Sequence, residues 1–213
     1  MDEIVKQALT KWPKVPACYG WLGLDARGNW YLRDDSAQAQ GPFSAGLAQS
    51  KGDRLEHSRL LEFIARNYEH DASGQWFFQN GPQRVFVGLD GAPWVFRLDD
   101  AAREWVTHTG TPVGAISAVL FAEDDGVLLV TERGVGQVLD RDLPALFERL
   151  AAPGGAALDP EALVSKLRAG PPQHVELSGR PVVAESVTQS ALPQRFGFVA
   201  EPAEPPGKSA KPA

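Results

Sequence analysis

The feature that most constrains this chain is a short pattern that predicts a turn followed by a strand and that occurs twice. The sequence reads DARGNWYLRD from Asp25 and DASGQWFFQN from Asp71. An aspartate side chain can accept hydrogen bonds from the backbone just ahead of it, and glycine adopts a positive φ without strain. Each copy therefore predicts a tight turn, after which a tryptophan, Trp30 or Trp76, opens a strand.

Two interpretations of this repeat are open. In the first, the turns are scaffolding, because alternation along the strands places each tryptophan on one face, where it can fill a core. In the second, Trp30 and Trp76 form an exposed platform for a sugar, a peptide or a base. We favour scaffolding, since both faces of these strands are apolar. A duplicated domain is disfavoured, because an extended segment precedes the first copy and a helix precedes the second.

Apolar spacing predicts a small number of helices. The strongest is expected over residues 55–68, with Asp53 as its N-cap. Its apolar stripe consists of Leu60, Leu61, Ile64 and Tyr68. Two further helices are expected at about 143–151 and 159–169, each preceded by an aspartate and carrying a proline near its start. A short helix is also expected from residue 2 to residue 12.

Most of the remaining chain has the composition of short strands. Apolar and aromatic runs are separated by turn residues, as in GQWFFQN, QRVFVGL and PWVFRLD. Asp125-Gly126 and Ser178-Gly179 lie between such runs and predict hairpins. The predicted fold class is therefore α+β, with short antiparallel strands in meanders and hairpins packed against a few helices.

The predicted organisation has two units and a tail. An α+β unit is expected over 1–98 and a β-rich unit over 99–200. Residues 201–213 hold 4 prolines and no large apolar side chain, which predicts a disordered Pro-rich tail. The small and polar residues at 34–52 predict an exposed loop.

Composition disfavours several classes of protein. The 213 residues carry 21 Lys and Arg against 27 Asp and Glu, a formal charge of −6, which argues against nucleic-acid or membrane partners. The single cysteine, Cys18, excludes an intrachain disulfide. The N-terminus has no secretory pattern and no stretch is long and apolar enough for a membrane helix, so a cytoplasmic location is expected.

Part of the sequence resembles a known group of uncharacterised proteins. The pattern comprises the turn Asp25, Gly28 and Trp30, the amphipathic helix with Leu60, Leu61 and Phe63, Pro82, a strand with Val85 and Val87, and finally Asp90 with Ala92-Pro93. This order is similar to that of small bacterial proteins classed as domains of unknown function, over about residues 12–98. The resemblance implies an α+β unit followed by a β-rich unit, and it implies no established activity.

The residue types that carry catalysis or bind metals do not form recognisable patterns. His57 and His70 each follow a glutamate, yet no His-x-x-x-His or His-x-His spacing occurs. Cys18 lies in an apolar setting, where a thiol is expected to have a raised pKa, and no Gly-x-Ser-x-Gly elbow is present. Gly134-x-Gly136 lacks the further residues of a phosphate loop. No catalytic residue, metal site or cofactor is therefore predicted.

One group of residues is a candidate binding site. Arg84 is expected on a strand near Asn80, Trp76 and Trp94, where a concave sheet could present it to an anionic ligand. The alternative is an arginine at a strand edge that discourages aggregation.

These observations favour a noncatalytic binding or adaptor protein with an unknown protein partner or small ligand. The alternative is a small-molecule enzyme or sensor with a pocket between helix 55–68 and the sheet. Exposed strand edges are compatible with a homodimer.

Overall fold

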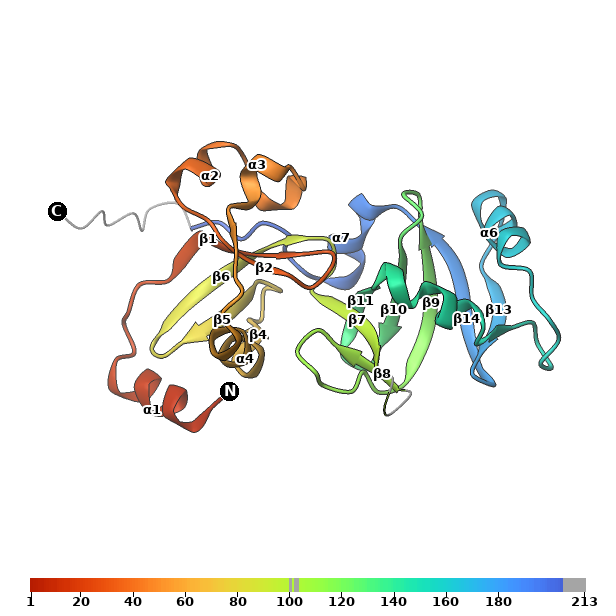
Figure 1. The fold of residues 1–213 in the computed structure, drawn as a ribbon, viewed down its shortest axis with the longest axis horizontal. Coiled ribbons are helices and arrows are strands. Elements are labelled where there is room, and N and C mark those ends of the chain that lie inside the picture. The colour runs from red at the N-terminus through yellow and green to blue at the C-terminus, as the bar shows by residue number, and fades with distance from the viewer. Residues whose placement is uncertain (100, 102–103, 205–213) are drawn as a thin grey trace. The chain divides into compact units, whose positions relative to one another are not determined.

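The computed structural model describes residues 1–99, 101 and 104–204, and divides the chain into two compact units. The first unit comprises Met1–Gly91 and the C-terminal residues from Gly197, and the second comprises Ala92–Phe196. Each unit contains one mixed sheet with helices (Figure 1), which confirms the α+β class. Residues 92–98, which the sequence grouped with the first unit, make their sheet contacts in the second.

The first unit is built around a six-stranded sheet of order β3-β2-β1-β6-β5-β4, in which β1 and β6 are parallel. Its elements are α1 (Glu3–Lys11), β1 (Cys18–Asp25), β2 (Trp30–Leu32), α2 (Asp35–Ala39), the 3-10 helix η1 (Phe43–Ala45), α3 (Ala48–Lys51), β3 (Asp53–Arg54), α4 (Ser58–Arg66), β4 (Tyr68–His70), β5 (Trp76–Asn80) and β6 (Gln83–Asp90).

The two repeated turns have the same geometry. Asp25 Oδ1 accepts hydrogen bonds from the backbone of residues 27 and 29, at 2.9 and 2.8 Å, and Asp71 Oδ1 accepts from residues 73 and 75, at 2.9 and 3.0 Å. The glycines have nearly equal φ angles, 81° for Gly28 and 79° for Gly74. The repeat is thus one local solution used twice, and it joins β1 to β2 and β4 to β5.

Both tryptophans that follow these turns are buried. Trp30 is 4% exposed and Trp76 is 7% exposed. Their rings meet the ring of Tyr68, with centroids 5.2 Å from Trp30 and 4.8 Å from Trp76. The scaffolding interpretation is therefore confirmed, because the two indoles pack on one shared aromatic residue inside the unit.

The strongest predicted helix is present, but it is shorter than predicted. α4 begins at Ser58 rather than at residue 55, and His57 caps it by accepting a hydrogen bond from the Leu60 amide, at 3.3 Å. The predicted cap, Asp53, belongs instead to β3 and pairs there with Leu32 of β2, so that prediction was wrong. Ile64 of α4 is fully buried and Phe63 meets Phe78 of β5 edge to face.

The prediction of an exposed loop at 34–52 was wrong. The segment forms α2, η1 and α3, which lie on the opposite side of the sheet from α4 (Figure 1). Phe43 of η1 is fully buried, because Gly23 and Gly88 of the sheet leave room for its ring. A side chain at either glycine would overlap Phe43.

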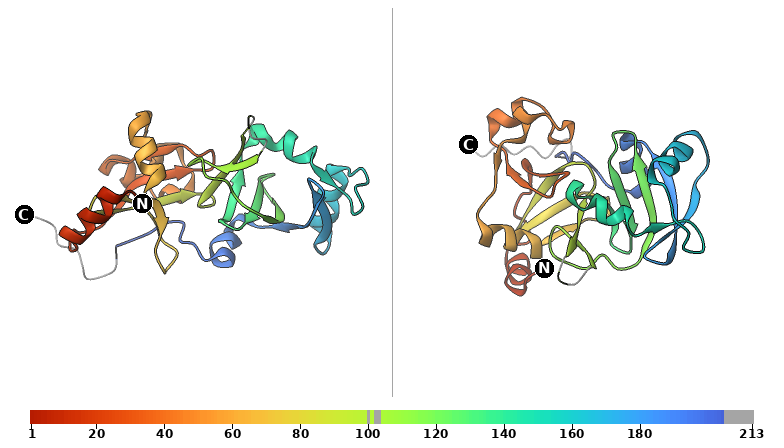
Figure 2. Two further views of the ribbon diagram at one scale, coloured as in Figure 1. Left: turned by 90° about the horizontal axis from the view of Figure 1, so that it is seen from below. Right: turned by 45° about the vertical axis from the view of Figure 1, so that its right-hand side comes forward.

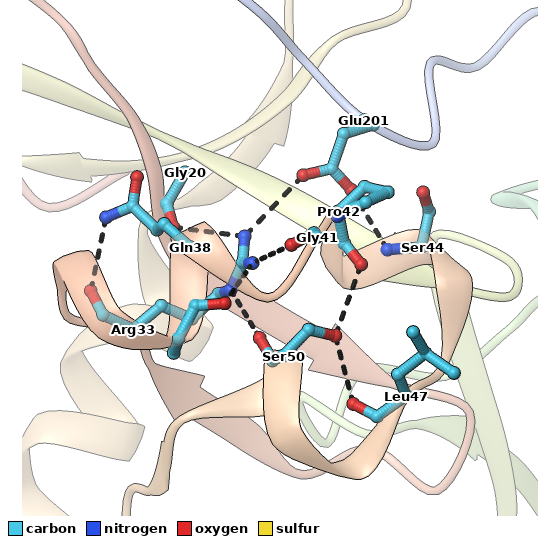
Figure 3. Close-up of polar contacts among 10 residues, drawn as sticks. Gly20, Arg33, Gln38, Gly41, Pro42, Ser44, Leu47, Ser50 and Glu201 are labelled. Atoms are coloured by element: carbon cyan, nitrogen blue, oxygen red, sulfur yellow. Dashed lines mark hydrogen bonds and ion pairs between the residues drawn. The ribbon is translucent and has the colours of Figure 1, made fainter.

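One buried arginine explains why this polar segment is ordered (Figure 3). Arg33 is 2% exposed, and its guanidinium donates to four backbone carbonyls. These are the carbonyls of Ser50 at 2.7 Å, Gly20 at 3.3 Å, Ala37 at 3.4 Å and Gly41 at 2.5 Å. The small polar residues of 34–52 thus supply backbone oxygens to a central cation, which satisfies its planar array of donors.

The second unit contains an eight-stranded sheet of order β12-β13-β14-β9-β10-β11-β7-β8. Its elements are β7 (Trp94–Asp99), β8 (Glu104–Thr107), β9 (Ile116–Ala122), β10 (Val127–Thr131), β11 (Gly134–Val138), η2 (Asp140–Asp142), α5 (Leu143–Phe147), β12 (Leu150–Ala151), α6 (Pro160–Ala169), β13 (Gln173–Leu177), β14 (Arg180–Val187), η3 (Gln189–Ala191) and α7 (Leu192–Phe196). The β14–β9 and β11–β7 pairs are parallel.

The two predicted helices of this unit have different outcomes. α6 spans Pro160–Ala169, and Asp159 caps it by accepting from the Glu161 amide at 3.0 Å, so the prediction for 159–169 is confirmed. The helix predicted at about 143–151 ends at Phe147, and Leu150 already belongs to β12. The predicted C-terminal end of that helix was therefore wrong.

The core of the second unit shows that its sheet is curled. One apolar cluster includes Trp105 from the β8 end and Val175 from β13, near the opposite end of the strand order. Leu146 of α5 and Leu163 of α6 join the same cluster. Trp105 of β8 and Leu177 of β13 also line one cavity, so the two ends of the strand order approach each other and the sheet bends around its core.

The predicted disordered tail begins too early. Glu201 and Pro202 pack on the first unit, and Pro202 is buried. The rest of that prediction, residues 205–213, lies outside the described residues. Among the described helices, none is long and apolar enough to cross a membrane.

Candidate functional site

The candidate site is a cavity of about 430 Å³ in the second unit, here called the second-unit cleft. Its size lies within the range of roughly 300–1,000 Å³ that is usual for small-ligand sites. It is lined by Glu104, Trp105, Pro112, Val113, Gly114, Ile116, Leu177, Ser178, Arg180 and Val182. Two segments far apart in the sequence therefore face each other across it.

The first wall is the segment from Pro112 to Ile116, which is tied to its neighbours by backbone contacts. The Val113 amide donates to the Trp105 carbonyl at 3.1 Å, and the Arg133 guanidinium donates to the Pro112 carbonyl at 2.7 Å. The Glu132 amide donates to the Ala115 carbonyl at 3.1 Å. These bonds hold the wall in place without any ligand, which limits the entropy lost on binding.

The second wall is the turn between β13 and β14. Ser178 and Gly179 both have positive φ, 52° and 73°, as a tight two-residue turn between antiparallel strands requires. The Ser178 amide donates to the Arg149 carbonyl at 2.8 Å, which fixes the turn against the chain before β12. The position of Arg180 is therefore set by a well-anchored turn.

The chemistry of the cleft combines an apolar lining with two opposite charges. Trp105 and Val113 are buried in the lining, while Glu104 of β8 and Arg180 of β14 are exposed. Neither charged side chain forms a hydrogen bond or ion pair with another residue that the structure describes. The arrangement suits a ligand with an apolar body, an anionic group toward Arg180 and a cationic group toward Glu104.

A second hollow in the same unit, about 670 Å³, lies beside α6 and Phe147. Three of its four charged residues already serve the fold. Asp159 caps α6, and Arg168 forms an ion pair with Asp125 at 2.7 Å. The second-unit cleft is the better candidate, because its charges are not engaged in this way.

The residues that the sequence singled out lie in different surroundings. Trp76 is buried against Tyr68, while Arg84 is exposed on β6 with its guanidinium 4.6 Å from the centre of the Phe77 ring. Asn80 is exposed at the end of β5. Trp94 belongs to the second unit, where its indole N–H donates to the Arg133 carbonyl at 2.8 Å.

The groups considered for metal or thiol chemistry are separated. Among the described residues, no three His, Cys, Asp or Glu side chains lie close enough together to hold a metal ion. His57 caps α4, and His70 lies beside Trp76 at a centroid distance of 4.9 Å. Burial raises the pKa of the Cys18 thiol, as its apolar setting predicted.

His108 makes the second unit sensitive to acid. Burial, with the nearby charge of Arg97, lowers the pKa of His108 to about 3, whereas an unfolded histidine titrates near 6.5. As the pH falls from 6.5 toward 3, His108 is therefore protonated in the unfolded chain but stays neutral in the folded unit. We expect the second unit to lose about 2.5 kcal/mol of stability between pH 7 and pH 4.5 from this group.

Urea unfolding across this pH range checks the prediction. His108→Asn should flatten the dependence, and His174→Asn, which changes an exposed histidine of β13, should leave it as in the wild type. Equal slopes for wild type and His108→Asn would contradict the assignment.

The fold and the cleft define a two-unit α+β protein with a cleft in its second unit. A model of the family DUF2944, described as "Protein of unknown function (DUF2946)", matches residues 1–203, and the chain belongs to this family. The resemblance to domains of unknown function is thereby confirmed, and no activity comes with it. No curated protein matches the sequence.

Among solved structures, the chain is similar to the crystal structure of a DUF1285 family protein from Silicibacter pomeroyi DSS-3. The similarity covers 76% of this chain and 78% of that chain, with 9% sequence identity and a TM-score of 0.45.

Proposed function

We propose that this protein is a noncatalytic binding protein of the bacterial cytoplasm and that the second-unit cleft holds its ligand. The observation that carries the proposal is the pair of opposite charges, Glu104 and Arg180, which have no partner within residues 1–99, 101 and 104–204 and lie beside the apolar lining of Trp105 and Val113. The single cysteine is in keeping with a reducing compartment.

The charges indicate the class of ligand. A zwitterion with an apolar side chain can satisfy both charges, because its carboxylate can pair with Arg180, its ammonium with Glu104, and its side chain can cover Trp105. Free amino acids and short whole peptides carry both charges. The end of a protein chain carries only one of them, so a protein partner would bind through a short terminal segment with a side chain of the opposite charge beside the terminus, which fits an adaptor role.

The alternative pocket, between helix 55–68 and the sheet, has less support. In that space Ile64 is fully buried and Phe63 packs edge to face on Phe78, with ring centroids 5.4 Å apart. Apolar side chains thus already fill the contact between α4 and β5.

A thermal-shift and calorimetry series tests the proposal on the full chain, with three sets of probes: free apolar amino acids, dipeptides and tetrapeptides. A compound that raises the melting temperature should bind at least about tenfold more weakly to Arg180→Ala, since a charged hydrogen bond contributes about 1.5–3 kcal/mol. Arg141→Ala, at an exposed arginine of the same unit outside the cleft, is the matched control.

Glu104→Gln separates the two ends of the ligand. It should weaken zwitterions and leave compounds without the ammonium unchanged. The proposal fails if no probe shifts the wild type, or if every shift survives in Arg180→Ala/Glu104→Gln.

A further inference from the structure

The last described residues form a strap across the first unit, here defined as residues 197–204. The chain passes through the whole second unit before it returns, and the strap then pairs with Gln75 and Leu89, which precede that unit in the sequence. The Val199 amide donates to the Gly74 carbonyl at 3.0 Å, and the Leu89 amide donates to the Ala200 carbonyl at 2.8 Å. The strap can be followed in blue, after α7, in Figure 2.

The strap is held by side-chain anchors as well as by its backbone. Phe198 is 5% exposed and Pro202 is also buried. Glu201 accepts a hydrogen bond from the Ser44 amide at 2.9 Å, and its other oxygen lies 3.7 Å from the Arg33 guanidinium (Figure 3). An aromatic anchor, main-chain pairing and a buried charge partner are the components by which proteins recognise extended peptides.

Two glycines make room for the strap. A Cβ at Gly74 would lie 2.0 Å from the Gly197 carbonyl oxygen, and a Cβ at Gly88 would lie 3.3 Å from a carboxylate oxygen of Glu201. Gly74 is also the glycine of the second repeated turn. That turn therefore has a second role: because Gly74 has no side chain, the strap can pack directly on its backbone.

We propose that this face of the first unit is a peptide-binding groove and that the strap is its ligand in cis. The ligand class in trans is an extended segment of a partner protein with the strap's own chemistry: a phenylalanine, a glutamate three residues later, and a proline directly after it. The strap must leave before such a segment binds, so the chain regulates its own groove. This inference is independent of the second-unit cleft.

The first test uses a fluorescent peptide with the sequence of residues 197–204, GFVAEPAE, added to the full chain. Phe198→Ala/Glu201→Gln weakens the strap without changing the groove. This variant should bind the peptide at least about tenfold more tightly than the wild type, because the competing cis ligand is weakened. A peptide with alanine in place of its first glutamate, the counterpart of Glu201, should bind the variant about tenfold more weakly.

The repeated turn supplies a matched pair of controls. In the strap-weakened chain, Gly74→Ala should abolish peptide binding, because its Cβ occupies the path of the ligand. Gly28→Ala imposes the same positive-φ strain at the equivalent position of the first turn and should leave the affinity within about threefold. Equal loss of binding in both variants would contradict the proposed path.

A cleavable version keeps the test decisive if the strap-weakened chain fails to fold. A protease site placed between Phe196 and Gly197 is cut only after the full chain has folded. The proposal predicts that excess GFVAEPAE peptide then displaces the C-terminal fragment, as followed by mass spectrometry. A fragment that stays bound against a large excess of peptide would overturn the inference, as would a folded strap-weakened chain that binds no peptide.

Discussion

Arg33→Met is expected to unfold the packing of residues 34–52 and to destabilise the first unit by about 3–5 kcal/mol. Methionine keeps an unbranched apolar stem but is shorter than arginine and removes every donor. The change leaves four backbone carbonyls and the Glu201 carboxylate without the cation that they surround. Arg33→Lys should recover part of the loss, because an ammonium keeps the charge but cannot match the planar geometry.

Hydrogen exchange resolved along the chain is the suitable measurement, because a protein with two units need not unfold in one step. Amides of residues 34–52 should lose protection in Arg33→Met, while those of β9 and β10 in the second unit should keep it. Arg59→Met, at an exposed arginine of α4, is the control and should change neither. Unchanged protection of 34–52 would show that Arg33 does not organise the segment.

The parts of the fold that were predictable depend on contacts over a few residues. In each repeated turn the aspartate accepts hydrogen bonds from amides two and four positions ahead. The geometry of the turn therefore depends only on the local sequence. The same holds for α6, where Asp159 and Pro160 lie directly at the helix start. Local hydrogen bonds of this kind leave a composition that can be recognised without knowledge of the rest of the chain.

The parts that were missed depend on contacts over long separations. Residues 34–52 have the composition of a loop. Their backbone carbonyls are held in place because they accept hydrogen bonds from the buried Arg33 guanidinium. Asp53 was a good cap by sequence, but pairing with Leu32 took it into β3. Glu201 and Pro202 read as part of a disordered tail because their partners, Arg33 and Ser44, lie at the other end of the chain.

The candidate site was hidden for a related reason. Glu104 and Arg180 are separated in the sequence by most of the second unit. They line one cavity because the sheet curls. The Ser178-Gly179 turn was visible in the sequence, yet nothing local indicated which segment would face it. Conversely, Trp76 was a candidate binding residue because it was expected near Arg84, and its place beside Tyr68 is a tertiary contact.

Trp30→Ala and Trp76→Ala are each expected to destabilise the first unit by about 3–5 kcal/mol, the usual cost of emptying the space of a large buried ring. Because both rings contact Tyr68, removal of one loosens the support of the other. The double variant should therefore cost less than the sum of the single variants, by about 0.5–1.5 kcal/mol. Hydrogen exchange of the first-unit amides, measured in the four chains, gives this coupling.

Trp12→Ala is the matched control for indole removal, because Trp12 is 51% exposed in the same unit. It should change the free energy of unfolding by less than about 0.5 kcal/mol. If Trp76→Ala were as mild as Trp12→Ala, the indole would not be part of the core and the turn would not be scaffolding. If the two buried tryptophans were strictly additive, the shared contact through Tyr68 would carry no energy, and each turn would stabilise its own strand pair alone.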